Sequence, residues 1–362
     1  MSAGSSEAVL SVRDLVVRFR SGKRVVYAVN GVSLEVAAGG AIGLVGESGS
    51  GKSVTSLAIM RLLPPNGWVE RGDVRFEGVD LLGLDEAEMR AMRGARLSMV
   101  LQDPLSSLNP VLTVGEQVEE AIRAHDDLGR RAARERAVEL LSSVGIPRAE
   151  EQLGRFPHQF SGGMRQRVMI ATALALRPSV LIADEPTTAL DVTVQAQVLD
   201  LLRTLTERIG TAIVLISHDL GVMARMTQEI CVMYAGFVVE RAPTAELFAR
   251  PRHPYTVGLL RSIPQRGEAR GALRAIEGSP PDLEREPVGC PFAPRCAWRL
   301  ERCWSEMPPL VRIEGERGHL LACHNPVHAD EVAEGRPRRP GFEPAPAPVV
   351  GSVASDAVEA RP

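Results

Sequence analysis

Hydrophobic and polar residues follow different periods in different parts of the chain, and each period predicts a different element. Between residues 8 and 45, apolar residues alternate with polar ones in short runs separated by glycines, which predicts short strands of an antiparallel patch. Between residues 113 and 144 they recur with the period of a helix, broken at Gly129 and Gly145. We therefore expect a helical insertion between two groups of strands.

Residues 162–218 alternate between the two periods. A helical pattern is followed by an apolar run at 180–184, a second helical pattern at 194–205 and a second apolar run at 212–217. Short apolar runs separated by helices are typical of buried parallel strands with crossover helices. The fold class predicted here is α/β.

The sequence GESGSGKS joins an apolar run, which ends at Val45, to a helical pattern. Glycines let successive backbone N–H groups turn toward one anion, and the helix start adds its positive end. Lys52 is placed to neutralise the outer phosphates of a nucleotide, and the Ser53 hydroxyl to ligate magnesium. The residues expected to hold the phosphates are Gly46, Ser48, Gly49, Ser50, Gly51, Lys52, Ser53 and Val54.

Two carboxylates, Asp184 and Glu185, follow a buried apolar run, at the strand end where ligands of open α/β sheets bind. Asp184 suits the magnesium site, together with Ser53. Glu185 is the candidate for the group that polarises the attacking water. His218 is expected to hold the γ-phosphate and the water, and Gln102 to complete the magnesium shell. Glu185, His218 and Gln102 are the predicted catalytic residues.

A second anion-binding helix start is predicted in FSGGMRQRV, residues 160–168. Ser161, Gly162 and Gly163 stand directly before a helical pattern. A nucleotide already held by one loop has little need of a second helix start in the same subunit. We therefore expect this one to serve a nucleotide bound on a partner chain.

Composition and charge narrow the classes of protein. The chain has 362 residues, 44% of them hydrophobic, and a net charge of −3, which permits one large domain with an appendage and gives no electrostatic case for nucleic acid. No apolar stretch approaches the roughly 18 residues of a membrane span, and the first residues lack the features of a secretory signal. We expect a cytosolic chain. Its last part, 331–362, predicts a disordered Pro/Ala-rich tail.

Four of the five cysteines form a cluster with the spacing C-x5-C-x6-C-x19-C. Cys231 stands apart in an apolar run and is predicted to be a core residue. The spacing lacks the C-x2-C pairs of common zinc sites, and four thiolates suit an iron–sulfur cluster. There are two alternatives to an iron–sulfur cluster. One is a zinc ion, for which His319 and His324 could be further ligands, and the other is free thiols. The cluster residues are Cys290, Cys296, Cys303 and Cys323.

Six motifs in order, GESGSGKS, LQDP, FSGGMRQR, LIADEP, TTALD and SHD, resemble the nucleotide-binding subunit of an ATP-binding cassette transporter over roughly residues 8–325. The resemblance implies a P-loop NTPase cassette with a RecA-like core, an antiparallel β patch and a helical subdomain. It implies ATP sandwiched between the Walker A loop of one subunit and the signature motif of the other, with Asp191 among its contacts. Phe19, or Tyr27 nearby, is expected to stack on adenine.

The segments MVLQDPLSSLNP, FSGGMRQRV, EPTTALDVTVQAQ, RHPYT and GCPFAPRC together resemble the ATPase subunits of dipeptide and oligopeptide importers. Similar subunits serve nickel or glutathione. The resemblance implies a [4Fe–4S] cluster at the four cysteines. Two departures, Ala41 where glutamate is usual and Ala297 where proline is common, are not expected to touch the phosphates.

The sequence therefore predicts the ATP-hydrolysing motor of a bacterial importer, at the cytoplasmic face of the inner membrane. Expected partners are two transmembrane permeases, a second ATPase subunit and an extracytoplasmic binding protein. Expected domains are a cassette at 8–261, with a helical subdomain at about 103–165, and a four-cysteine extension at 262–330. A soluble ATPase of DNA repair or translation is the alternative from another class; its second cassette or long coiled coil is not found in this sequence.

Overall fold

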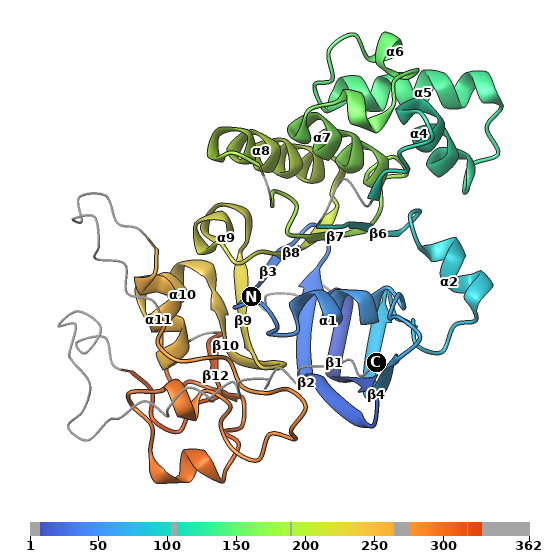
Figure 1. The fold of residues 1–362 in the computed structure, drawn as a ribbon. Coiled ribbons are helices and arrows are strands. Elements are labelled where there is room, and N and C mark those ends of the chain that lie inside the picture. The colour runs from blue at the N-terminus through green and yellow to red at the C-terminus, as the bar shows by residue number, and fades with distance from the viewer. Residues whose placement is uncertain (1–7, 103–106, 189, 264–275, 317, 328–362) are drawn as a thin grey trace, which may run out of the picture.

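The described part of the chain contains two β-sheets, a lobe of helices, and further helices that lie beside the sheets (Figure 1). The structure, a computed structural model, describes residues 8–102, 107–188, 190–263, 276–316 and 318–327. The predicted tail at 331–362 lies outside these ranges.

The smaller sheet is antiparallel, as predicted, with the strand order β2-β1-β4-β5. Its strands are β1 (Ala8–Ser21), β2 (Arg24–Ala37), β4 (Gly67–Phe76) and β5 (Val79–Asp80). The expectation of short strands was wrong, because β1 and β2 each run unbroken for 14 residues. A register shift between Val12 and Leu15 absorbs the change in alternation, so that both side chains stay buried.

The larger sheet has the order β11-β12-β10-β9-β3-β8-β7-β6. The run from β9 to β6 is parallel, which confirms the predicted α/β core, and the strands on the other side of β9 are antiparallel. The parallel strands are β3 (Ala41–Val45), β6 (Leu97–Val100), β7 (Val180–Asp184), β8 (Ala212–Ile216) and β9 (Glu229–Tyr234). The antiparallel edge consists of β10 (Phe237–Pro243), β11 (Val311–Arg312) and β12 (Leu320–Leu321).

Helices follow the strands in the order that the periodicity predicted. The helical insertion consists of α4 (Val114–Arg123), α5 (Arg130–Ser143) and α6 (Ala149–Gln152). The others are α1 (Lys52–Ile59), α2 (Glu86–Met92), α7 (Gly162–Ala173), α8 (Val192–Ile209), α9 (Leu220–Met226), α10 (Thr244–Ala249) and α11 (Pro254–Arg261). None of the helices within the described ranges is long and apolar enough to cross a membrane.

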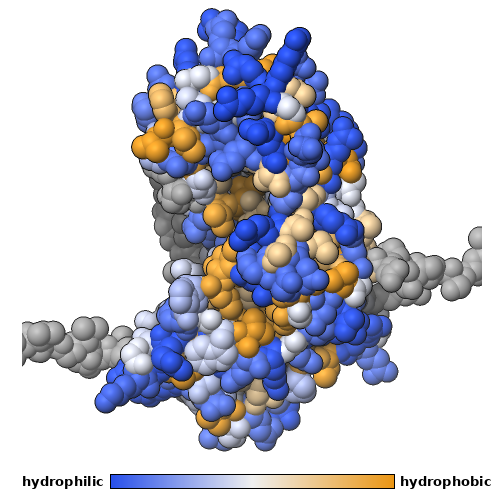
Figure 2. Space-filling view, turned by 90° about the vertical axis from the view of Figure 1, so that its right-hand side faces the viewer, coloured by the Kyte–Doolittle hydropathy of each residue, from blue (hydrophilic) through white to orange (hydrophobic). Residues whose placement is uncertain are grey.

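Alternate residues of the parallel strands enter two different hydrophobic cores. On β7, Leu181 and Ala183 pack with the helical lobe, which consists of α4, α5, α6, α7 and α8 (Figure 1), whereas Val180 and Ile182 pack with the antiparallel sheet. The polar residues that follow these strands are therefore held between two packed layers. Figure 2 shows the surface hollowed between the helical lobe and the rest of the molecule, with hydrophobic residues at the margin of the hollow.

The C-terminal extension shares a sheet with the cassette. Strand β12 pairs with β10 through Glu240↔Leu321 and Arg241↔Leu320, and β11 continues the edge. The cysteine-bearing segment also contributes Phe292 and Cys296 to the hydrophobic core on the same face of the larger sheet as the helical lobe. Sequence periodicity could not show this, because the two strands have only two residues each.

A core substitution in α8 tests this packing. Leu202 is fully buried, so Leu202→Ala should lower the free energy of unfolding by about 2–5 kcal/mol through lost burial and a residual cavity. The matched control is Glu207→Ala, at an exposed position of the same helix. Urea unfolding followed by circular dichroism measures both. A midpoint shift for Leu202→Ala no larger than that of the control would contradict the packing described here.

Candidate nucleotide-binding site

The predicted phosphate loop connects the end of β3 to the start of α1, at the carboxyl edge of the parallel strands. Gly51 precedes α1 with a φ of 98°, and within the described residues no side chain caps this helix, so its first N–H groups can bind an anion. A Cβ on Gly51 would lie 2.6 Å from the Ala28 carbonyl oxygen, and one on Gly46 2.2 Å from that of Met233. Only glycine fits such contacts.

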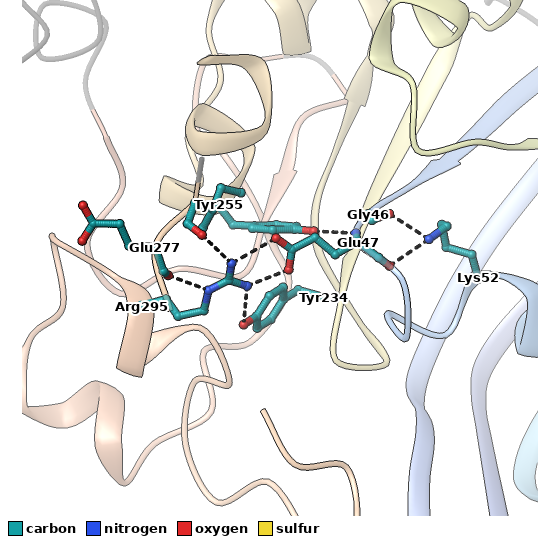
Figure 3. Close-up of polar contacts among 8 residues, drawn as sticks. Gly46, Glu47, Lys52, Tyr234, Tyr255, Glu277 and Arg295 are labelled. Carbon is teal, nitrogen blue, oxygen red and sulfur yellow. Dashed lines mark hydrogen bonds and ion pairs between the residues drawn. The ribbon is translucent and has the colours of Figure 1, made fainter. Parts of the chain in front are cut away.

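Lys52 lies back across the loop (Figure 3). Its Nζ donates to the carbonyl oxygens of Gly46 at 2.8 Å and Glu47 at 2.9 Å. Burial lowers the pKa of this ammonium, while nearby carboxylates, with Glu185 the strongest, act in the opposite direction. The loop thus combines a positive charge with free backbone N–H groups, which is the combination that binds a polyphosphate.

Ser53 and Asp184 meet between α1 and β7. The Ser53 hydroxyl donates to Asp184 Oδ1 at 3.1 Å. Asp184 is 4% exposed, and this burial raises the pKa of its carboxyl group against the effect of the Ser53 hydrogen bond. Hard oxygen atoms of this kind fit Mg²⁺, and a bound cation would offset the cost of burying the carboxylate. Two of the three predicted magnesium ligands are therefore adjacent.

Glu185 lies among the other predicted catalytic residues. Gln102 Nε2 donates to Glu185 Oε2 at 3.0 Å, and His218 Nδ1 lies 3.4 Å from Oε1. Glu185 has a φ of 45°, in the left-handed region that non-glycine residues adopt mainly where the surroundings impose it. Gln102, which was expected to ligate the magnesium ion, is thus hydrogen-bonded to Glu185, the predicted catalytic base.

Thr188 is a contact of Glu185 that the sequence analysis did not assign. Its Oγ1 donates to Glu185 Oε2 at 2.8 Å, and its backbone N–H donates to the Glu185 carbonyl oxygen at 3.1 Å. The spacing of three residues in a segment that ends a strand is typical of a turn, and could have indicated this contact. Together with Gln102, Thr188 fixes one oxygen of the carboxylate.

The predicted second helix start is the N-terminus of α7, in the helical lobe beside α8 and apart from α1 (Figure 1). Ser161 caps it, accepting the backbone N–H of Met164 at 3.3 Å. A Cβ on Gly163 would lie 2.5 Å from Val194 Cγ1, and one on Gly162 3.3 Å from a Leu190 methyl group. Close packing of α7 on α8 is therefore a second reason for these glycines, besides anion binding.

Asp191 caps the neighbouring helix. Its Oδ1 accepts the backbone N–H groups of Thr193 at 3.1 Å and Val194 at 3.0 Å. This cap fixes the start of α8 next to the start of α7. The expected nucleotide contact of Asp191 stays a prediction.

Both candidates for adenine stacking lie on the antiparallel sheet. Phe19 pairs with Val26, and its ring lies against Gly67, where an added Cβ would come within 2.6 Å. Tyr27 pairs with Arg18, whose guanidinium lies 4.6 Å from the Tyr27 ring centroid. Both rings are half-buried, and the assignment stays a prediction for either.

The four clustered cysteines are unpaired thiols in the extension. The Cys290 N–H donates to the Cys303 carbonyl oxygen at 2.8 Å, which brings two of their loops together. Burial raises the pKa of Cys290 to about 11 and that of Cys323 to about 12. Cys231 is fully buried in β9, as predicted for a core residue.

The thiolates of one tetrahedral zinc ion lie about 3.8 Å apart, from the Zn–S length of about 2.3 Å. Within the described ranges, the one group of at least three potential ligands whose atoms lie within 4.8 Å of one another is Glu246, Glu316 and His319. No three of the four cysteine sulfurs, all of which lie in the described ranges, come within 4.8 Å of one another, so the thiols are not gathered around the position of one zinc ion.

The two histidines considered as zinc ligands have other partners. His319 is fully buried, with Nε2 2.8 Å from Glu240 Oε1 and Nδ1 2.8 Å from Glu316 Oε2. His324 Nε2 lies 3.1 Å from the Glu306 carbonyl oxygen. These contacts do not support either histidine as a zinc ligand beside the cysteines.

Comparisons with known proteins agree with this geometry. Residues 29–188 match the family model described as ABC transporter, and residues 239–303 match the oligopeptide/dipeptide transporter C-terminal region. A putative peptide import ATP-binding protein of Brucella melitensis is 49% identical over 326 residues, covering 87% of this chain and 96% of that protein. The oligopeptide transport ATP-binding protein OppD of Bacillus subtilis is 49% identical over 307 residues, covering 84% and 86%.

Solved structures support the same cassette fold. A dimeric ATP-binding cassette in a post-hydrolysis state, bound to ADP and phosphate, has a TM-score of 0.59 and 30% identity, covering 65% of this chain and 98% of that one. With the relatives above, this shows that the chain belongs to the ABC transporter family, as an ATP-binding subunit of the branch with the oligopeptide/dipeptide C-terminal region.

Proposed function

We propose that this chain is the ATP-hydrolysing motor subunit of a bacterial importer for dipeptides or oligopeptides. The observation that carries the proposal is one site in which Lys52, the Ser53–Asp184 pair and Glu185 lie at the same sheet edge. The names of relatives about half identical to this chain support peptides as the transported class.

Hydrolysis at such a site depends mainly on positioning and charge neutralisation. Lys52 and the loop N–H groups hold the outer phosphates of ATP. Glu185, with one oxygen fixed by Gln102 and Thr188, orients the attacking water, and His218 holds the γ-phosphate. Ser53 and Asp184, with Gln102 as the third expected ligand, would hold Mg²⁺, which would supply charge neutralisation on the phosphates.

A second cassette completes the site. The start of α7 lies in the other lobe from the loop of its own chain, so Ser161, Gly162 and Gly163 are free to contact a nucleotide held by a partner subunit. ATP then closes the pair of cassettes and hydrolysis releases it. We propose a paralogous ATPase as this partner, giving a heterodimer.

The transported peptide crosses the membrane through two permease subunits, and an extracytoplasmic binding protein delivers it. We place the chain at the cytoplasmic face of the inner membrane, bound to those permeases. We propose that the link from β6 to the helical lobe, on which Leu101 is 42% and Val111 75% exposed, is the part of the chain that faces them.

We further propose that Cys290, Cys296, Cys303 and Cys323 hold a [4Fe–4S] cluster in the extension at 262–330. Four thiolates are the usual complement of such a cluster, and all four cysteines are unpaired thiols within one short extension. When bound, the cluster would supply a cross-link between four loops that have little core of their own, because metal binding to thiols is coupled to folding.

Replacing the predicted base tests the catalytic assignment. Glu185→Gln keeps the side-chain shape but loses the charge that polarises water, so hydrolysis should fall by roughly 10²- to 10⁴-fold while ATP still binds. Phosphate release measures turnover, and fluorescence of a labelled ATP analogue measures binding. Near-normal turnover in this variant would remove Glu185 from its role.

A negative charge introduced at the start of α7 tests whether two cassettes share one nucleotide site. Gly162→Asp places a carboxylate where a partner's phosphates are expected, so hydrolysis by the assembled transporter should be abolished. ATP binding by the isolated chain should stay unchanged, since its own loop is intact. ATPase activity of the reconstituted transporter measures hydrolysis, and titration of the isolated chain with ATP measures binding. Unimpaired hydrolysis, or lost binding in the isolated chain, would argue against the shared site.

Anaerobic purification tests the metal cluster. The protein should be brown, with broad visible absorption that Cys296→Ser removes and Cys231→Ser, at a core position, retains. Absorption spectra and metal analysis give the readout. A colourless protein with one zinc ion per chain would refute the iron–sulfur assignment.

A further inference from the structure

Glu47, the second residue of the phosphate loop, has every polar group engaged (Figure 3). Its N–H donates to Tyr255 Oη at 2.8 Å, and its carbonyl oxygen accepts Lys52 Nζ at 2.9 Å. Its carboxylate accepts both ends of the Arg295 guanidinium, at 2.6 and 3.0 Å. Glu47 thus connects the lysine of the nucleotide site to residues more than 200 positions away in sequence.

Arg295 uses all of its donors in this arrangement. Nη1 reaches Glu47 and the Tyr234 hydroxyl, the latter at 3.2 Å, and Nη2 reaches Glu47 and the Ile276 carbonyl oxygen at 3.0 Å. Nε donates to the Glu277 carbonyl oxygen at 2.9 Å. The side chain is 4% exposed. A buried, fully bonded and bidentate guanidinium has one geometry, which lysine cannot reproduce.

The extension itself holds Arg295 in place. Arg295 ends the short 3-10 helix Ala293–Arg295, directly before Cys296 and three residues after Phe292. The Phe292 ring packs on the rings of Tyr234 and Tyr255, with centroids 5.2 and 5.4 Å apart. The motifs GCPFAPRC and RHPYT, which have no part in ATP hydrolysis as described above, therefore converge on Glu47.

The charges give this contact a direct bearing on nucleotide binding. A carboxylate in a loop that binds a polyphosphate repels the ligand unless it is neutralised, and the Glu47 carboxylate is close enough to act on the charge of Lys52. Arg295 supplies the compensating charge from outside the cassette's nucleotide motifs. The same loop residues also line a small cavity with Pro280, Pro281 and Leu283 of the extension.

We propose that Arg295 is a positioning residue for ATP: by neutralising and orienting Glu47, it lets the C-terminal extension set the affinity of the phosphate loop. This proposal rests on the proposed ATP site. Its consequence is that a disturbance of the Cys290–Cys296 segment reaches the nucleotide through one ion pair.

The test is a double-mutant cycle in the full-length chain, with a fluorescent ATP analogue as the probe. Arg295→Ala leaves the Glu47 carboxylate unneutralised and should weaken binding by about 2- to 30-fold, the usual range for residues that modulate coupling without contacting the ligand. Arg295→Ala/Glu47→Gln removes the bare charge and should recover most of the affinity. In the ATPase assay the change should appear in KM, with kcat at saturating ATP nearly unchanged.

The matched control is Arg24→Ala. It breaks the exposed Arg24–Glu284 ion pair, which also joins the extension to the cassette but does not end on the phosphate loop. Its affinity should equal that of the wild type. Circular dichroism checks folding. If Arg295→Ala does not fold, Arg295→Lys carries the test, because it keeps the charge but loses the bidentate geometry and should bind less tightly than the wild type.

Three results would overturn the proposal: wild-type affinity in Arg295→Ala, wild-type affinity in Arg295→Lys, or a double variant that binds no better than Arg295→Ala. Lys52→Ala separates this inference from the proposed function. If Lys52→Ala abolishes binding and the Arg295 variants do not weaken it, only the role of Arg295 fails. If Lys52→Ala binds like the wild type, the ATP site itself is wrong.

Discussion

The backbone of the phosphate loop must come into direct contact with a highly charged ligand, and the rest of the site depends on that constraint. Side chains would block the approach, and the packing around Gly46 and Gly51 already leaves no room for a Cβ. The parallel strands bring the loop to the sheet edge where Asp184 and Glu185 also end. Two hydrophobic cores, one on each face of the sheet, hold that edge in place.

A site for a polyanion that is built partly from carboxylates needs compensation at each of them. Asp184 has the Ser53 hydroxyl and, when loaded, a cation. The Glu185 carboxylate accepts hydrogen bonds from the side chains of Gln102 and Thr188. The third carboxylate, on Glu47, is compensated by Arg295 from the C-terminal extension. The cassette alone therefore does not contain all the charges that its nucleotide site needs.

Local features of the site were predictable from the sequence, because neighbouring residues determine them. The phosphate loop, the carboxylates at the end of β7 and the cap of α7 each follow from a few consecutive residues, and the strand ends and helix starts lie where those residues indicated. The length of β1 was not predictable, since a register shift hides the alternation of Val12 and Leu15. Nor was the Glu47–Arg295 pair, whose members are 248 positions apart. Tertiary packing alone brings such residues together.

The central claim is that the loop at residues 46–53 holds the phosphates of ATP while the start of α7 contacts a nucleotide on another cassette. The most direct measurement is an experimental structure of the assembled transporter with ATP and Mg²⁺ bound to the Glu185→Gln variant. The account predicts phosphates beside Lys52, with Ser161 and Gly163 facing the nucleotide of the second cassette. Phosphates bound elsewhere on the chain, or an α7 start directed at its own chain's nucleotide, would contradict it.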